Sequence, residues 1–138
     1  MAQRSRAVHA QEATSLHVQR FTVAYEYPVV FTDGLLRPDN PTLVQALTRL
    51  EPLRRHRCLV FVDDGICAAR PGIEDEITGY AAAHARSIEL AAPPIPVPGG
   101  ERIKGDLWFV EQMQGRLFEH RIDRHSYVIA IGGGAMLD

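Results

Sequence analysis

The sequence has few cysteines and no excess of charge of one sign. Its 138 residues include only two cysteines, Cys58 and Cys67, whose spacing fits neither a metal motif nor a thioredoxin-like motif. We interpret Cys58 as a small buried core residue. The scarcity of cysteine excludes a disulfide framework and predicts a reducing, cytoplasmic location. With 15 basic and 17 acidic side chains the net charge is −2, which gives no general electrostatic reason to bind nucleic acid.

Long hydrophobic runs are absent as well. The uninterrupted apolar runs span only a few residues, far short of a membrane span, and residues 1–16 contain no apolar core typical of a secretory signal. We therefore expect no membrane partner, and we interpret residues 1–16 as a flexible polar leader. The remainder, 17–138, has the ordinary composition of a globular domain, with 46% apolar and 23% charged residues.

The first part after the leader is rich in β-branched and aromatic residues. Two runs, 18–25 and 27–32, are predicted to be strands of an N-terminal β-hairpin. Pro28 lacks an N–H group, so it must lie at a strand start or a sheet edge. Asp33 and Gly34 then provide a turn.

From residue 40 onward, strand and helix patterns alternate. Asn40 and Pro41 predict a helix start, with Leu43, Leu47 and Leu50 at helical spacing. Short continuous apolar runs at 58–63 and 127–131 predict buried strands. Helices are predicted from Pro71, with a buried stripe, and over 103–120, with one apolar face. This alternation predicts an α/β fold with a parallel sheet, Rossmann-like in class. The members of the two helix faces are Ile73, Ile77, Tyr80, His84 and Ile88 for the first, and Leu107, Val110, Gln114 and Leu117 for the second.

The first candidate site follows the predicted strand 58–63, where the sequence reads Asp63-Asp64-Gly65. In open α/β sheets, ligands bind beyond the carboxyl ends of the strands. A carboxylate there can accept hydrogen bonds from ribose hydroxyls. The alternative interpretation is an ordinary strand-to-loop turn, for which Asp and Gly are common.

The second candidate is the stretch Gly99-Gly100-Glu101-Arg102-Ile103-Lys104. Two glycines lead to a predicted helix start. Glu101 suits the positive end of a helix dipole, so it needs no further explanation. Lys104 is unfavourable there, which favours a phosphate or carboxylate ligand.

The third candidate is the glycine run Gly132-Gly133-Gly134, which directly follows the strand 127–131. Consecutive glycines permit positive φ angles and a close backbone approach to a ligand. A helix that begins after such a loop can bind a pyrophosphate through its first N–H groups. The run is not a G-x-G-x-x-G motif.

The histidines and the arginine cluster carry less information. The six histidines show no metal-ligand spacing. We expect His17 and His56 to be exposed, and His84 to be a partly buried, hydrogen-bonded helix residue. The cluster from Arg54 to Arg57 is interpreted as a solvated turn, with an anion contact as the alternative.

These three candidates, in this order, resemble the start of the sugar phosphate cyclases, the 3-dehydroquinate synthase superfamily. The matching pieces are FVDDG at 61–65, PGGERIK at 98–104 and DRHSYVIAIGGGAMLD at 123–138, of which the last, with its Arg124, is the most specific. The resemblance covers about residues 18–138. The opening, RFTVAYEYPVVFTDGL, is more similar to the cyclase-like branch than to the shikimate-pathway enzymes.

The resemblance implies an NAD-binding Rossmann-like domain. It implies that the complete protein eliminates phosphate from a keto-sugar phosphate and closes a carbocycle. It places Asp63 on the adenosine ribose of NAD, and it assigns a divalent metal, usually zinc, and a helical domain to sequence beyond residue 138. The residues that it implies for the cofactor are Asp63, Glu101, Lys104, Gly133, Gly134, Ala135 and Asp138.

The sequence departs from the family in two respects. Gly65 stands where many members have Asn, so one contact to the adenosine half is missing or supplied elsewhere. The catalytic and metal-binding residues of the family lie beyond Asp138. We therefore expect this chain to be a fragment, incomplete at the C-terminus and inactive alone, whose complete form is a homodimer acting on a small sugar phosphate.

Two other functions remain open. One is a stand-alone flavodoxin-like binding or signalling module, suggested by the acidic pair Asp63 and Asp64 at a strand end. The absence of an acidic residue after the later strand, which ends at Gly132, speaks against it. The other is a structural remnant that pairs with another chain through an exposed apolar face.

Overall fold

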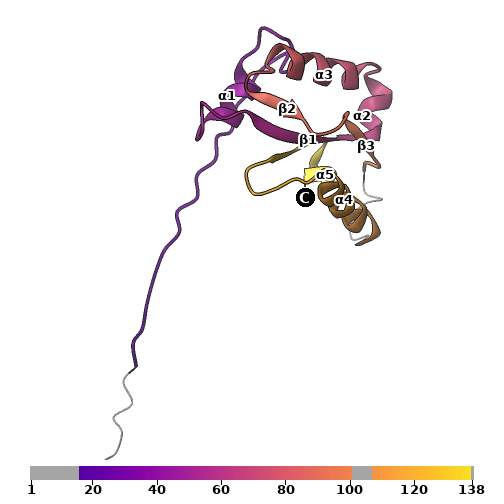
Figure 1. The fold of residues 1–138 in the computed structure, drawn as a ribbon. Coiled ribbons are helices and arrows are strands. Elements are labelled where there is room, and N and C mark those ends of the chain that lie inside the picture. The colour runs from indigo at the N-terminus through magenta and orange to yellow at the C-terminus, as the bar shows by residue number, and fades with distance from the viewer. Residues whose placement is uncertain (1–15, 101–106, 138) are drawn as a thin grey trace, which may run out of the picture.

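A computed structural model describes residues 16–100 and 107–137 of the chain. These residues form an α/β fold with a small sheet in which all the strand pairs are parallel (Figure 1). The sheet confirms the predicted α/β class with a parallel sheet and the positions of the predicted strands at 58–63 and 127–131. The first of these is buried as predicted, whereas the predicted burial of the second is wrong, because its residues are half-buried or exposed. Its strands are β1 (His56–Asp63), β2 (Ile88–Leu90), β3 (Ile95–Val97) and β4 (Tyr127–Ile131).

The strand β1 lies at the centre of the sheet. Cys58 is opposite both Leu90 in β2 and Tyr127 in β4, so these two strands lie along opposite edges of β1. Phe61 is opposite Ile95 in β3 and also has a partner in β4. The short strands β2 and β3 therefore follow one another along the same edge. The middle of β1, from Cys58 to Val62, is continuously apolar and buried, as expected of a parallel strand that is covered on both faces.

Five helices connect and flank the strands in the described parts of the chain. Their bounds are α1 (Thr42–Thr48), α2 (Asp64–Ala69), α3 (Ile73–Ala83), α4 (Leu107–Glu119) and α5 (Gly134–Leu137). The helix α3 lies over one face of the sheet, and α4 lies on the opposite side (Figure 1). The sheet is thus the middle layer between helices.

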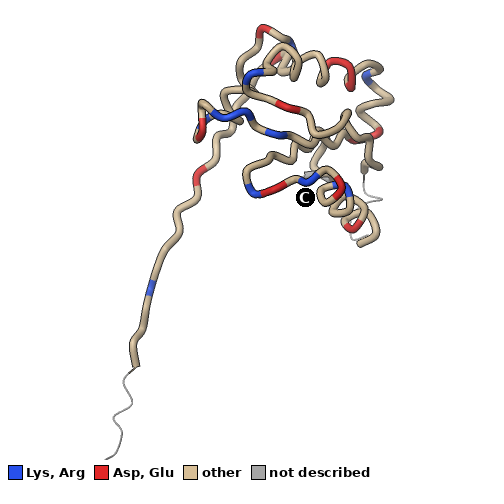
Figure 2. Tube along the Cα trace, viewed as in Figure 1, with Lys and Arg blue, Asp and Glu red and all other residues tan. Residues whose placement is uncertain are grey.

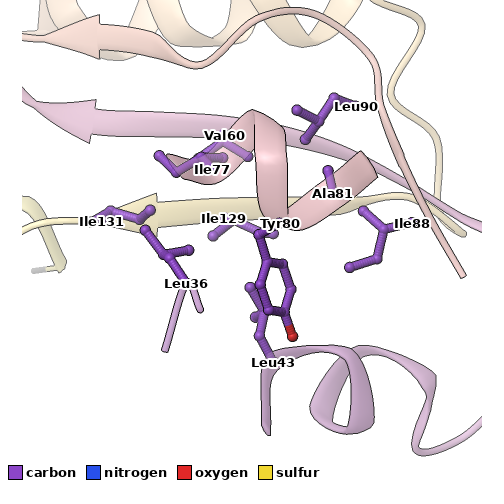
Figure 3. Close-up of a pocket in the computed structure, with 10 residues that line it drawn as sticks. All are labelled: Leu36, Leu43, Val60, Ile77, Tyr80, Ala81, Ile88, Leu90, Ile129 and Ile131. Atoms are coloured by element: carbon purple, nitrogen blue, oxygen red, sulfur yellow. The ribbon is translucent and has the colours of Figure 1, made fainter. Parts of the chain in front are cut away.

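The main core lies between the sheet and the helices α1 and α3. Alternate side chains of β1, among them Val60 and Val62, pack with Ile73 and Ile77 of α3. A small cavity of about 20 Å³ remains there, with an almost entirely hydrocarbon lining that includes the ring of Tyr80 (Figure 3). It is large enough for at most about one water molecule, which would find few polar partners.

Asn40 and Tyr80 attach α1 to this core. The helix α1 begins at Thr42, one residue later than predicted, with Pro41 directly before it. The side-chain oxygen of Asn40 accepts a hydrogen bond from the N–H of Thr42 (2.9 Å), so Asn40 still satisfies an N–H group at the helix start, as a cap residue does. The buried hydroxyl of Tyr80 donates to the carbonyl of Asn40 (2.9 Å) and accepts from the N–H of Val44 (3.2 Å). Each of these bonds satisfies a backbone group that the short helix leaves unpaired.

The predicted N-terminal hairpin is wrong for this structure. Residues 16–32 form no strand and extend away from the sheet (Figure 1). Side chains such as Phe21 and Phe31 are about nine-tenths exposed (89% and 94%). Strand propensity describes a fit to a half-buried pleated surface, and no such surface lies beside this segment.

Two helix predictions also need correction. The helix α3 ends at Ala83, so Ile88 belongs to β2 and not to the helical stripe. Leu50, predicted to be on the apolar face of α1, lies after the helix and is 73% exposed.

The predicted apolar face of α4 is shifted around the helix. Leu107, Val110 and Gln114 are exposed, whereas Phe109 and Met113 are half-buried together with Leu117. The spacing of four residues from Phe109 to Leu117 gives a helical stripe of its own. The start of the predicted helix, 103–106, lies outside the described residues.

Candidate functional site

The strands β1 and β3 end side by side at one edge of the sheet. From β1 the chain continues into α2 and α3, on one face, whereas the chain after β3 leads to α4, on the other (Figure 1). Where connections leave neighbouring parallel strands toward opposite faces, α/β proteins commonly bind ligands beyond the carboxyl ends of those strands. The first two candidate sites, at Asp63 and at Gly99, lie here.

Asp63 is the last residue of β1 and is half-buried. Its Oδ1 accepts a hydrogen bond from the N–H of Gly65 (2.8 Å), so Asp63 caps α2. For the Oδ1 atom of Asp63, the structure therefore agrees with the alternative interpretation, in which the acidic pair belongs to an ordinary strand-to-loop turn. A capping carboxylate at a strand end is also fixed in position, which is what recognition of a ribose requires.

Asp64 connects the two strand ends. Its Oδ1 accepts a hydrogen bond from the N–H of Gly99 (3.0 Å), the residue two positions beyond β3. The Cα of Gly99 lies against the carboxylate of Asp63, and a Cβ at this position would overlap both oxygens. From the sequence, Asp64 had a role only in the alternative of a signalling module, as part of the acidic pair, and its contact with Gly99 was not predicted.

The glycine run lies at the same edge, beyond β4. Val62 is paired with Ile131, so Gly132 follows directly beside the end of β1. The helix α5 begins at Gly134, as the prediction of a helix after the glycines requires. Gly133 and Gly134 are exposed, and a Cβ added to either would meet no atom within 4 Å. Open space therefore adjoins the first turn of α5.

The expected positive φ angles of this run are not observed. Among the described glycines, only Gly34, Gly72 and Gly100 have positive φ. At Gly132 the reason for glycine is steric instead, because an added Cβ would lie 2.6 Å from the sulfur of Met136. The loop thus turns tightly onto α5 without left-handed backbone.

Several residues implied for the cofactor cannot be placed at this edge of the sheet. Glu101, Lys104 and Asp138 lie outside the described residues, and the side chain of Ala135 is likewise not described. The described part of the candidate site therefore consists of Asp63, Gly133 and Gly134, together with the groups that support them.

Arg124 lies at the opposite end of the sheet, before the start of β4. Its Nε donates to Nε2 of His125 (3.0 Å), and Arg54 approaches the other ring nitrogen (3.1 Å). The neighbouring Asp123 accepts hydrogen bonds from the hydroxyl of Ser126 and the N–H of His125, and these hold the pKa of Asp123 below its ordinary value. Arg124 shares a sequence motif with the glycine run, but β4 separates the two in space.

The first two arginines of the cluster, Arg54 and Arg55, lie just before β1 and are paired with acidic neighbours (Figure 2), whereas Arg57 lies within β1 and its buried Nε has no hydrogen-bond partner among the described residues. Arg54 pairs with Glu51 (3.0 Å) and Arg55 with Glu89 (3.1 Å), on exposed surface. This agrees with a solvated turn. His56, however, was expected to be exposed and is buried, at 1% exposure. It is the first residue of the central strand.

His84 and His56 each retain a buried nitrogen without a hydrogen bond. His84 is half-buried beside the ring of Tyr80 (4.4 Å between centroids), but its Nε2 has no partner, contrary to the expectation of a hydrogen-bonded histidine. In His56, Nε2 contacts the carbonyl of Glu51 (3.2 Å), whereas Nδ1 has no partner.

The two thiols are poorly suited to nucleophilic chemistry. Burial raises the pKa of Cys58 to about 11. The pKa of Cys67 is also raised, first by desolvation and then by the nearby carboxylates of Glu74 and Asp64. Because the thiolate is the reactive form, both cysteines are held in the unreactive state.

The described residues contain neither a metal-ligand cluster nor a membrane-spanning helix. Within 16–100 and 107–137, no group of three or more metal-ligating side chains is found, and no helix is long and apolar enough to cross a membrane. Comparisons with protein-family models, with curated proteins and with solved structures give no match.

Proposed function

We propose that this chain binds NAD at the carboxyl edge of its sheet, as the Rossmann-like cofactor-binding unit of a sugar phosphate cyclase resembling 3-dehydroquinate synthase. One observation carries the proposal: Asp63, Gly99 and the run from Gly132 to Gly134 are far apart in sequence and lie at the same edge of the sheet. These belong to the three motifs on which the resemblance depends.

The described residues fit a dinucleotide. The Asp63 carboxylate, fixed by its bond to Gly65, is an acceptor suited to ribose hydroxyls. Gly133 and Gly134 adjoin open space at the first turn of α5. The N–H of Met136 in this turn donates to the carbonyl of Gly133 (3.0 Å), whereas the first N–H groups of a helix have no partner within it. Such groups attract the negative charge of a pyrophosphate.

In this proposal the chain itself binds and orients the cofactor. Bound NAD would accept a hydride from the carbon that bears a hydroxyl group of the sugar phosphate and would later return it. Glu101, Lys104, Ala135 and Asp138 would complete the cofactor site, as the resemblance implies. Phosphate elimination, ring closure and the divalent metal would belong to the complete cyclase and its helical domain.

Isothermal titration of the chain with NAD tests this proposal. The expected result is saturable binding of both NAD and ADP-ribose, because the proposed contacts are to ribose and pyrophosphate. Asp63→Asn retains an oxygen that can cap α2 but removes the charge, and should weaken binding roughly 10-fold or more. Asp75→Asn, the same change on the exposed side of α3, should leave affinity unchanged.

A second pair of variants tests the glycine run. Gly133→Ala meets open space, so the fold should tolerate it, but the new methyl group would obstruct the approach of the pyrophosphate. Gly115→Ala, in α4, also meets open space and is the matched control. A natively folded chain that does not bind NAD, or equal affinities of the two variants, would overturn the proposal.

The signalling alternative receives less support from the same geometry. Both members of its acidic pair accept backbone hydrogen bonds, Asp63 from Gly65 and Asp64 from Gly99. Phosphorylation of Asp63 or a neighbour by a small phosphodonor, without NAD binding, would favour that alternative.

A further inference from the structure

The side chain of Asp64 holds the chain beyond β3 against the end of β1. Asp64 is the exposed first residue of α2, directly after β1. Its Oδ1 accepts a hydrogen bond from the N–H of Gly99 (3.0 Å), a buried residue two positions beyond β3. A buried backbone N–H requires a hydrogen-bond partner. Asp64 supplies that partner and therefore helps to determine where Gly99 lies.

The position of Gly99 in turn determines the surroundings of the Asp63 carboxylate. A Cβ added to Gly99 would lie 2.1 Å from each carboxylate oxygen of Asp63, so the Cα of Gly99 packs directly on this group. Oδ1 of Asp63 also accepts a hydrogen bond from the N–H of Gly65 (2.8 Å). Two contacts thus orient the Asp63 carboxylate, and Asp64 acts on one of them through Gly99.

The two consecutive glycines after β3 differ in what they contact. Gly100 is exposed, with a φ angle of 75°, and an added Cβ there would meet no atom within 4 Å. Of these two glycines, packing excludes a side chain only at Gly99, the residue that Asp64 holds. The bond to Asp64 and the contact with Asp63 therefore meet at one residue. Such a supporting contact keeps a binding group in a fixed geometry.

We propose that Asp64 is a positioning residue of the cofactor site, which acts through Gly99 and keeps the Asp63 carboxylate oriented toward the ribose of the adenosine half. This inference rests on the proposed binding of NAD at the carboxyl edge of the sheet. Asp63 would contact the ribose directly, whereas the Oδ1 atom of Asp64 is directed to Gly99. A fixed acceptor loses less conformational freedom on binding than a mobile one, so the contact raises affinity.

Asp64→Ala should weaken the adenosine half of the interaction. The buried N–H of Gly99 loses its acceptor, so Gly99 moves toward water and its contact with Asp63 loosens. We expect the affinities for NAD and for ADP-ribose to fall roughly 5- to 10-fold. Nicotinamide mononucleotide lacks the adenosine half, so its affinity should not change.

Asp64→Asn separates the positioning role from the charge. Asparagine keeps the Oδ1 atom that accepts from Gly99, so this variant should bind NAD with nearly the affinity of the wild-type chain. Asp75→Ala is the matched control, because it removes an exposed acidic side chain from the first turn of α3. It should leave every affinity unchanged.

Amide hydrogen exchange, measured without cofactor, tests the first step of the proposal. The amide of Gly99 should be protected in the wild-type chain and in Asp64→Asn, and it should exchange faster in Asp64→Ala. Equal exchange in the three proteins would show that Asp64 does not hold Gly99 and would overturn the positioning role. This result is independent of whether the chain binds NAD.

Titration of the full chain and its variants tests the second step. Isothermal titration measures the affinities for NAD and ADP-ribose, and chemical-shift titration measures that for nicotinamide mononucleotide. Weaker binding of NAD and ADP-ribose in Asp64→Ala, with recovery in Asp64→Asn, is the expected result. Equal affinities of Asp64→Ala and Asp75→Ala, or an equal loss for nicotinamide mononucleotide, would overturn the positioning role alone. A folded wild-type chain that does not bind NAD would overturn the proposed function as well.

Discussion

The carboxylate of Asp63 packs against the Cα of Gly99, so that a methyl group on Gly99 would overlap both carboxylate oxygens. The contact joins the end of the central strand to the residue two positions beyond β3. It explains the requirement for glycine at position 99 by steric exclusion, since the φ angle of Gly99 is not positive.

Gly99→Ala should therefore destabilise the fold. The Asp63 side chain cannot move freely, because it caps α2 through the N–H of Gly65 (2.8 Å). We expect a loss of about 1–3 kcal/mol in the free energy of unfolding, as for other overpacked sites. Urea denaturation followed by circular dichroism measures it, and an unchanged midpoint would contradict the steric argument.

Gly79→Ala is also a glycine-to-alanine substitution, but we expect it to raise the free energy of unfolding. Gly79 lies inside α3 on its exposed side, and an added Cβ meets no atom within 4 Å. Replacing a helical glycine by alanine lowers the entropy of the unfolded chain and should stabilise the protein by about 0.5–1 kcal/mol. A rise in the denaturation midpoint checks this, and a fall would indicate an unrecognised constraint at Gly79.

The sequence patterns predicted two of the four described strands. Burial leaves a clear apolar run in the centre of β1, whereas the three-residue strands β2 and β3 are too short to leave one. The continuous apolar run at 58–63 and the run at 127–131 became β1 and β4. The helix cap at Asn40 was also predictable, since it depends on neighbouring residues alone. These features are local, or they follow directly from the apolar pattern.

Other features depend on tertiary contacts that spacing does not encode. The exposed pattern of 18–32 predicted strands, but a strand needs a neighbour and the described chain supplies none. The burial of His56 results from its position at the start of the central strand. The contact of Asp64 with Gly99 spans 35 residues, so the sequence could indicate the acidic doublet but not its partner.

Tyr80→Phe should weaken the attachment of α1. The hydroxyl of Tyr80 is the donor to the carbonyl of Asn40 and the acceptor from the N–H of Val44, at a position that is 2% exposed. Removing it leaves two backbone groups without this partner, which should cost about 1–3 kcal/mol. Tyr27→Phe, at an exposed site, should have no measurable effect. Equal thermal stability of the two variants would contradict the role of the Tyr80 hydroxyl.

The last prediction concerns the alkaline stability of the fold and the thiol of Cys58. Cys58 is fully buried in β1, and burial raises its pKa from the ordinary 9.0 to about 11. Between these two values the unfolded chain loses the thiol proton more readily than the folded chain. The unfolded state is therefore favoured as the pH rises. The neutral thiol makes its full contribution to the free energy of unfolding below about pH 9, and this contribution is lost as the pH rises toward 11.

Cys58→Ala isolates this effect from other groups that titrate in alkali. Two pKa units at a single site imply a loss of about 1.4 kcal/mol at pH 10 relative to pH 7. The difference in unfolding free energy between wild type and Cys58→Ala should shrink by that amount over this interval. Urea titrations of both proteins at pH 7 and pH 10 provide the measurement. A difference that is the same at both pH values would show that the thiol ionises as readily in the folded chain as in the unfolded one.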